Sequence, residues 1–207
     1  PGGPHRAGSR VRILFSRMLL ACGRALLSLR YRVRLEGLDI LQAEAERARE
    51  RGRGVLVLPN HPAFMDPALL CTQLAAFDLR PLADSHQISR PWLAALTGCI
   101  SLPDLCRDGL SARDRVREAL DSCAAALARG ENVLLYPSGG LTRDGGTHLG
   151  GNSGAFRLLQ AVPDCGLVLV RTRGLWGSSF SRAAGEPVLG RALLRGLVSL
   201  LCHGLFF

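Results

Sequence analysis

The sequence contains no lysine and no Cys-x-x-C pair, and aromatic residues make up only 5% of it. All 26 basic residues are arginine, which points to the base composition of the genome rather than to a function. The seven cysteines are odd in number and lie among apolar neighbours, so we expect buried free thiols in a reducing compartment and no metal site. Few aromatic side chains accompany the basic ones, which argues against nucleic acid as a partner.

Long uncharged apolar runs are also missing, so the sequence predicts neither a transmembrane span nor a signal peptide. Acidic residues are absent before Glu36, whereas eight arginines precede it. Residues 36–207 hold 18 arginines and 17 acids, so nearly all of the net charge of +9 lies at the N-terminal end. A basic end on a neutral body predicts an anionic partner, and we expect a membrane surface with anionic lipid.

The basic end has the periodicity of an amphipathic helix over residues 11–29. Its main apolar stripe covers about 140° of a helical wheel and contains Val11, Leu14, Phe15, Met18, Leu19, Cys22, Ala25, Leu26 and Leu29. The opposite half carries Arg12, Arg17, Arg24 and Arg30, with a second apolar stripe of Ile13, Leu20 and Leu27 among them. We expect residues 1–35 to form a basic segment whose helix lies in the membrane interface. The alternative is an ordinary helix packed on the domain, and the second stripe would let it touch protein and lipid at once.

Residues 36–207 show short apolar runs that alternate with helical patterns. Predicted strands cover residues 55–58, 79–83, 100–102, 133–136 and 167–170, and residues 31–36 alternate as an extended segment would. Predicted helices cover residues 38–51, 67–77, 89–95, 111–129 and 153–161. This order predicts a single α/β domain over residues 36–207, with a largely parallel or mixed sheet flanked by helices.

Two polar loops follow predicted strands. Residues 60–66 come directly after the strand at 55–58, and residues 137–145 come directly after the strand at 133–136. Sites in open α/β sheets form outside the carboxyl ends of the strands. If the two strands are parallel, both loops open on one edge of the sheet and share a cleft.

His61 is the histidine with a carboxylate placed to serve it. Pro62 keeps His61 out of a helix, and Asp66-Pro67 is typical of an N-cap followed by a first-turn proline. A carboxylate there can fix the imidazole tautomer and stabilise the imidazolium, which a general base needs when it takes a proton from a hydroxyl. The alternative is that Asp66 merely caps its helix and His61 is an ordinary loop residue.

These residues carry a resemblance. Asn60-His61-x4-Asp66 after an apolar strand resembles the H-x4-D motif of the glycerolipid and lysophospholipid acyltransferases, the 1-acylglycerol-3-phosphate acyltransferase family. The block from Tyr136 to Arg143 resembles the family's later P-E-G-T-R-type block. Its Gly-Leu-Thr-Arg ending is similar to the form in acyltransferase domains fused to acyl-carrier-protein synthetase or transporter modules. The chain begins with Pro-Gly-Gly-Pro and ends on an apolar run, so we expect a piece of a longer protein.

The resemblance implies an O-acyltransferase with His61 as general base, oriented by Asp66. It would move an acyl group from acyl-CoA or acyl-carrier protein to a hydroxyl of glycerol phosphate or a lysophospholipid, without a bound cofactor. It also implies a peripheral protein on the cytoplasmic face of the inner (plasma) membrane. The substrate-binding candidates that it suggests, with phosphate held by amides, hydroxyls and a guanidinium, are Asn60, Ser138, Gly139, Gly140, Thr142 and Arg143.

The sequence departs from the family pattern in the later blocks. Ser138 stands where the glutamate is usual, and Gly140 stands where the fused domains have arginine. The intermediate block over residues 98–103 lacks its final arginine. Arg143 is the residue that would replace the missing charge.

Two other interpretations rest on neighbouring residues. Gly151-Asn152-Ser153-Gly154 approximates a nucleophile elbow of a serine hydrolase, although no strand pattern precedes it, and Asn152 or Ser153 would otherwise cap a helix facing the acyl donor. Arg171 and Arg173 would meet phosphate or lie on a solvated edge. The changed block also allows an inactive membrane lipid-binding domain.

Overall fold

The computed structural model describes residues 5–84, 99–102, 110–146, 148–149 and 151–185, together with Gly190 and Val198. Within this part of the chain, five strands form one sheet in the order β3-β2-β4-β1-β5, and every pair of neighbours is parallel. The strands are β1 (Val55–Pro59), β2 (Arg80–Asp84), β3 (Ile100–Leu102), β4 (Val133–Leu134) and β5 (Gly166–Val170). The predicted α/β class is therefore confirmed, with the sheet parallel rather than mixed.

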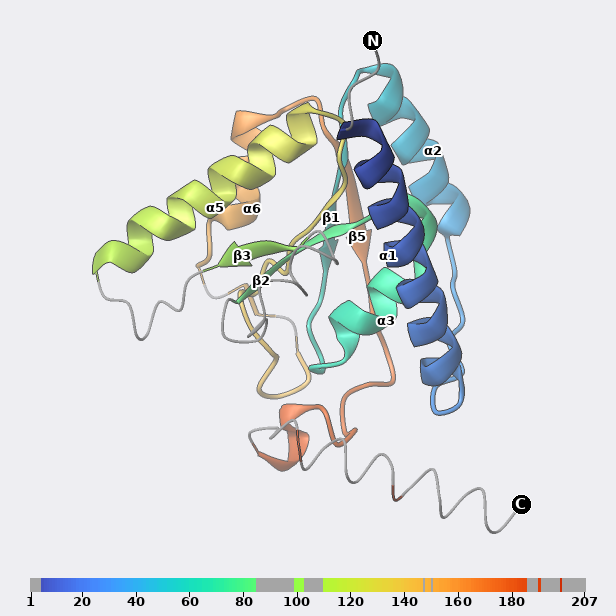
Figure 1. Ribbon diagram of the computed structural model, residues 1–207. Coiled ribbons are helices and arrows are strands. Elements are labelled where there is room, and N and C mark those ends of the chain that lie inside the picture. Colours follow the sequence, from blue (N-terminus) through green and yellow to red (C-terminus); the bar gives the residue numbers. More distant parts are fainter. Residues whose placement is uncertain are drawn as a thin grey trace.

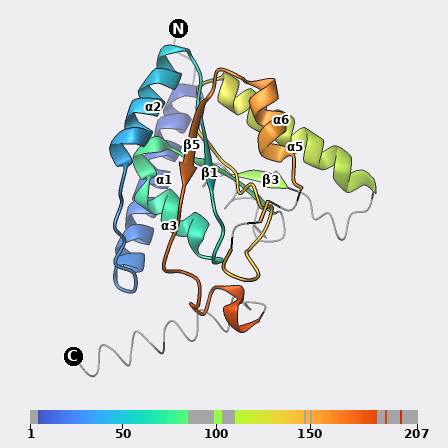
Figure 2. The ribbon, with the colours of Figure 1, turned by 180° about the vertical axis from the view of Figure 1, so that it is seen from behind.

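Helices cover both faces of the sheet (Figures 1 and 2). The α-helices are α1 (His5–Ser28), α2 (Leu38–Glu50), α3 (Asp66–Gln73), α5 (Leu110–Ala128) and α6 (Gly154–Ala161). Two 3₁₀ turns, η1 (Ala75–Phe77) and η2 (Arg182–Ala184), complete the described elements. α1, α2 and α3 lie on one side in both views, and α5 and α6 lie on the other.

The buried strands explain this layering. Side chains alternate between the two faces of a strand, so Val55 and Val57 of β1 join the core under α2 and α3. Leu56 and Leu58 join the core under α5 and α6. All five residues of β1 are buried, as expected of a strand inside a parallel sheet that is covered on both faces.

α1 packs against α3, and in its described side chains, from Ser16 onward, the narrow stripe faces the protein while the main stripe is exposed. Leu20, Gly23 and Leu27 are partly buried, and a Cβ on Gly23 would lie 3.2 Å from Thr72 Cγ2, so glycine allows the close approach. Met18 and Leu26 of the main stripe are 56% and 69% exposed. The helix therefore contacts protein, as the second stripe predicted, while its larger apolar face has no partner in the described chain. No helix of that part is long and apolar enough to cross a membrane.

Several predicted elements have different bounds. The helix expected at 67–77 is divided into α3 and η1, which ends at Asp78 in a left-handed conformation (φ 45°). β4 ends at Leu134 rather than at residue 136, because Tyr136 turns toward His61. Residues 31–36 form no strand, since no neighbouring chain pairs with them. Cys22 is exposed rather than buried. The helix expected at 89–95 lies outside the described residues.

Candidate active site

The carboxyl ends of β4, β1 and β5 lie side by side at one edge of the sheet. Each strand continues into a loop that holds predicted site residues: 60–65 after β1, 135–146 after β4 and 171–173 after β5. The parallel order confirms that the two loops singled out in the sequence open on the same edge. A direct bond joins them, because the backbone N–H of Thr142 donates to the carbonyl of His61 at 2.9 Å.

His61 and Asp66 form a buried pair. Nδ1 of His61 lies 3.1 Å from Oδ2 of Asp66, and the side chains are 12% and 0% exposed. The same carboxylate oxygen accepts a hydrogen bond from the backbone N–H of Ala63 at 3.0 Å. An ionised carboxylate accepts only, so it pairs with a proton on Nδ1, and a neutral imidazole held in this way keeps the lone pair of Nε2. A general base requires this arrangement.

Asp66 does not cap its helix in the expected way. Met65 occupies the N-cap position, Asp66 is the first helical residue, and Pro67 follows in the first turn. The carboxylate reaches back to Ala63 and His61 instead of to the amides of α3. The interpretation of Asp66 as a mere helix cap is therefore wrong.

Burial dominates the electrostatics of this carboxylate. It raises the pKa of Asp66, and the hydrogen bonds from His61 and Ala63 act in the opposite direction without cancelling it. One oxygen, Oδ1, is buried and has no partner in the described structure. The hydrogen bonds to Oδ2 hold the side chain in the orientation that serves His61.

Tyr136 lies directly against the imidazole. Its ring is stacked on that of His61, with centroids 4.0 Å apart and planes 23° from parallel. The side chain is buried among the residues under α2 and α3, and its hydroxyl has no partner in the described chain. Burial, then the charges of Asp66 and Cys71, raise the pKa of Tyr136 well above its usual value. No role was predicted for this residue, although an aromatic side chain just before the second loop was the available signal.

Asn60 holds two of the loops together. Its Nδ2 donates to the carbonyl of Thr172 at 3.0 Å, and its Oδ1 accepts from the N–H of Thr172 at 2.6 Å. These two bonds join the loops after β1 and β5. The contact expected between Asn60 and substrate stays a prediction.

The loop after β4 is closed by its own hydrogen bonds. The Ser138 hydroxyl donates to the carbonyl of Gly140 at 2.8 Å, and the Thr142 hydroxyl donates to the carbonyl of Gly146. Gly139 has a φ of 66°, and a Cβ there would lie 3.0 Å from Nδ2 of Asn152. Glycine is therefore required at this turn both by its conformation and by close packing.

Arginines line the open side of these loops. Arg143 is exposed in the loop after β4, and Arg171 and Arg173 are exposed after β5. None of the three makes a hydrogen bond or ion pair with the described residues. Their guanidinium groups therefore face solvent, and the binding of an anionic ligand by them stays a prediction.

Asn152 and Ser153 do not behave as predicted caps. Ser153 stands at the N-cap of α6, but its side chain makes no capping bond. Nδ2 of Asn152 donates instead to the carbonyl of Ser138 at 2.8 Å. The exposed Ser153 has no histidine partner in the described chain and follows a loop, so it lacks the strand-turn-helix setting of a nucleophile elbow.

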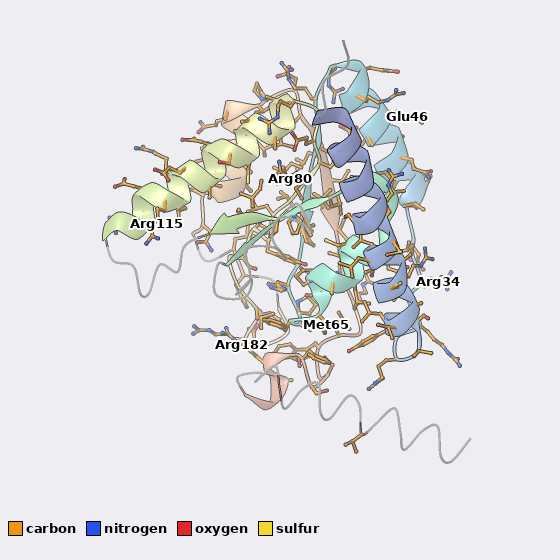
Figure 3. The ribbon with its side chains drawn as sticks, viewed as in Figure 1. Arg34, Glu46, Met65, Arg80, Arg115 and Arg182 are labelled. Carbon is orange, nitrogen blue, oxygen red and sulfur yellow. The ribbon has the colours of Figure 1, made fainter. Side chains whose placement is uncertain are left out.

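The segment 174–185 packs against the loop after β1, and the sequence did not predict this contact. The N–H of Phe64 donates to the carbonyl of Phe180 at 2.8 Å, and Leu175 and Phe180 pack on Ala63. Nη1 of Arg182 donates to the carbonyl of Leu141 at 3.4 Å. Figure 3 shows Arg182 below Met65, the N-cap residue of α3. No spacing or motif in the sequence connects this segment with the two loops.

The described residues contain no group of three His, Cys, Asp or Glu side chains able to hold a metal ion.

Similarity to known proteins identifies the family of the chain. No curated protein matches the chain. A protein-family model described as Acyltransferase matches residues 32–171, which is more than half of the sequence and includes His61, Asp66 and the loop after β4. The chain belongs to the acyltransferase family.

Proposed function

We propose that the protein is an O-acyltransferase that moves an acyl group from a thioester to a hydroxyl of a phosphate-bearing glycerolipid precursor. The observation that carries the proposal is the His61–Asp66 pair, with Nδ1 held by a buried carboxylate at 3.1 Å. The family supplies acyl transfer in general. The pair supports the finer assignment, because activating a hydroxyl requires a base with a free Nε2.

The proposed reaction is a direct transfer. Nε2 of His61 takes the proton of the acceptor hydroxyl as its oxygen attacks the thioester carbon. The carbon–oxygen ester bond forms, the carbon–sulfur bond breaks, and the thiolate of CoA or of the carrier protein leaves with the proton from His61. Asp66 stabilises the imidazolium between these two steps, and no acyl-enzyme is formed.

The proposed acceptor is glycerol 3-phosphate or a lysophospholipid. Arg143, Arg171 and Arg173 lie on loops at the same edge as His61 and have no partner in the described chain. Guanidinium groups bind phosphate oxygens bidentately. Arg143 follows directly on Thr142, whose N–H bonds to the His61 carbonyl, so it is the arginine most closely tied to the base.

The proposed place of action is the cytoplasmic face of a membrane, to which the protein binds peripherally. Support comes from α1, whose main apolar stripe is exposed while its narrow stripe packs on α3. Arginines near anionic lipid each contribute about 1 kcal/mol. A lipid acceptor rarely leaves the bilayer, because each buried CH₂ of an acyl chain contributes about 0.8 kcal/mol.

The test is acylation of an acceptor panel with acyl-CoA and acyl-carrier protein as donors. The panel contains glycerol 3-phosphate, several lysophospholipids and a monoacylglycerol that has no phosphate. We expect thiol release that depends on a phosphate-bearing acceptor and yields an acylated product. Arg143→Ala should raise KM for that acceptor roughly tenfold or more and leave kcat for the thioester chemistry within a few-fold, since it removes a charge-assisted bond that is made in the ground state as well.

Two other outcomes would replace this proposal. Thioester loss without acylated product, abolished by Ser153→Ala and retained in His61→Ala, would establish a hydrolase. Lipid binding without turnover of any donor and acceptor pair would favour the inactive lipid-binding domain.

A further inference from the structure

Tyr136 is the buried aromatic residue on which the imidazole of His61 rests. The two rings are stacked with centroids 4.0 Å apart, and they lie just after the ends of the neighbouring parallel strands β4 and β1. The side chain reaches under α3 into the core that also contains Val57 and Leu70. It is therefore part of the rigid interior rather than of the open loop.

Two buried polar atoms remain without partners beside this stack. They are the hydroxyl of Tyr136 and Oδ1 of Asp66. Both residues adjoin His61, whose ring is stacked on that of Tyr136 and whose Nδ1 lies 3.1 Å from Oδ2 of Asp66. One is a donor and the other an acceptor, and more than nine in ten buried polar groups in proteins are satisfied by protein or by ordered water.

We propose that Tyr136 is a positioning residue for acyl transfer: its ring fixes the plane of the His61 imidazole, and its hydroxyl donates through one buried water to Oδ1 of Asp66. The proposal rests on the proposed function. Tyr136 becomes a third member beside the His61–Asp66 pair. It acts through those two residues and touches no substrate.

The ring is needed because the carboxylate alone does not fix the imidazole. A single hydrogen bond from Nδ1 leaves the ring free to rock about the Cβ–Cγ bond. A flat aromatic face at 4.0 Å blocks that motion on one side. The π face also favours the imidazolium that forms when Nε2 takes the proton. Both effects keep Nε2 aimed at the acceptor during the transfer.

The hydroxyl acts on the other partner. Oδ2 of Asp66 already accepts from His61 and Ala63, while Oδ1 accepts from nothing in the described chain. A water with at least two polar neighbours satisfies a buried pair of this kind. Burial raises the pKa of Tyr136 well above its usual value, so the phenol is a hydrogen-bond donor at neutral pH.

The experiment compares Tyr136→Phe, which keeps the ring, with Tyr136→Leu, which removes it. Phe77→Leu is the matched control, because Phe77 is a partly buried aromatic residue packed on the same core. The full chain is labelled with ¹⁵N-histidine, and the His61 resonances are assigned by their absence in His61→Ala. The readouts are the tautomer of His61 and the positions of its ring protons.

We expect His61 of the wild type, of Tyr136→Phe and of Phe77→Leu to be protonated at Nδ1. Its ring protons should resonate upfield, because they lie over an aromatic face. In Tyr136→Leu the upfield shift should disappear and the Nε2–H tautomer should become populated. A wild-type His61 without the upfield shift, or an unchanged tautomer in a folded Tyr136→Leu protein, would overturn the proposal. The wild-type and Tyr136→Phe spectra decide the stacking even if the leucine variant fails to fold.

Kinetics separate this inference from the proposed function. Tyr136→Phe should lower kcat about twofold to fivefold and Tyr136→Leu about tenfold or more, both with KM for acceptor nearly unchanged. A purely structural role would lower the folded fraction and leave kcat per folded molecule as in the wild type, as expected for Phe77→Leu. If no acyl transfer is found at all, the proposed function fails, while the tautomer and ring-proton measurements still test the positioning role.

Discussion

The carboxyl group of Asp66 is completely buried. Burial raises its pKa, so the folded state holds the proton more tightly than the unfolded chain does. Its contribution to stability is therefore favourable at low pH and is lost as the pH rises from the usual carboxyl range through the raised pKa. The ionised form is the one that can accept a hydrogen bond from Nδ1 of His61 through Oδ2.

Asp66→Asn should separate these two effects. The amide oxygen can still accept from Ala63, and the desolvated charge is gone, so the free energy of unfolding at pH 7 should be unchanged or higher. That oxygen would also still accept from Nδ1 of His61, because Nδ1 and the N–H of Ala63 bond to one atom, Oδ2. A neutral amide no longer stabilises the imidazolium, which should lower kcat by roughly 10²–10⁴. Chemical denaturation and steady-state kinetics check both. A large loss of stability with little loss of kcat would contradict this account.

The His61–Asp66 pair was predictable from residue spacing, whereas its supports were not. His61 and Asp66 stand five positions apart around Pro62, and this local geometry is short enough to read from the chain. Tyr136 reaches His61 only because β4 lies beside β1. Asn60 bonds to Thr172, which lies 112 positions away in the sequence and which β5 brings within 3.0 Å of the Asn60 amide. Contacts of this kind depend on strand order.

α1 shows what a helical pattern does and does not determine. A helical wheel separates two apolar stripes. The narrower stripe packs against α3, where Gly23 lets the two helices approach closely. The broader stripe includes Leu26 and Leu29, which are 69% and 64% exposed. Periodicity alone gives both stripes, but tertiary packing decides which one is buried.

The exposed stripe should mediate membrane binding. Leu26→Ser/Leu29→Ser removes apolar surface that packs on nothing in the described chain, so stability should change little. Sedimentation with phosphatidylcholine–phosphatidylglycerol vesicles should fall roughly tenfold or more, since each leucine contributes about 1.5–3 kcal/mol when fully buried. The matched control is Leu27→Ala on the packed stripe, which should destabilise the fold and leave vesicle binding of the folded protein intact. Equal binding by the exposed-stripe variant and the wild type would exclude this role.

Element boundaries also reflect tertiary context. β1 and β3 were predicted to within one residue, because a short apolar run between polar ends identifies a buried strand. β4 is shorter than its apolar run because Tyr136 leaves the sheet for His61. α3 stops at Gln73 although the helical pattern continues, and the chain then tightens into η1. Sequence patterns locate such elements, while neighbouring residues set their ends.

The whole molecule assembles the site from segments that are far apart in the sequence. The parallel sheet and the meeting of the two loops follow from the alternation of strands and helices, and both were predicted. The order β4-β1-β5 was not, since nothing in the sequence states which strands are neighbours. The closing segment 174–185 has no regular pattern apart from its 3₁₀ turn, so its packing on Ala63 and its bond to Leu141 were also unpredictable.

The central claim is that His61 transfers a proton during acylation. The molecule offers a matched control, because His148 also pairs with a carboxylate, Nε2 lying 2.8 Å from Oδ2 of Asp144, but on an exposed loop. The most direct measurement is mass-spectrometric detection of acylated acceptor formed by wild type, His61→Ala and His148→Ala from the same thioester. The account predicts product from wild type and from His148→Ala, and a loss of roughly 10²–10⁴ in rate for His61→Ala. Equal product formation by folded His61→Ala and wild type would contradict it.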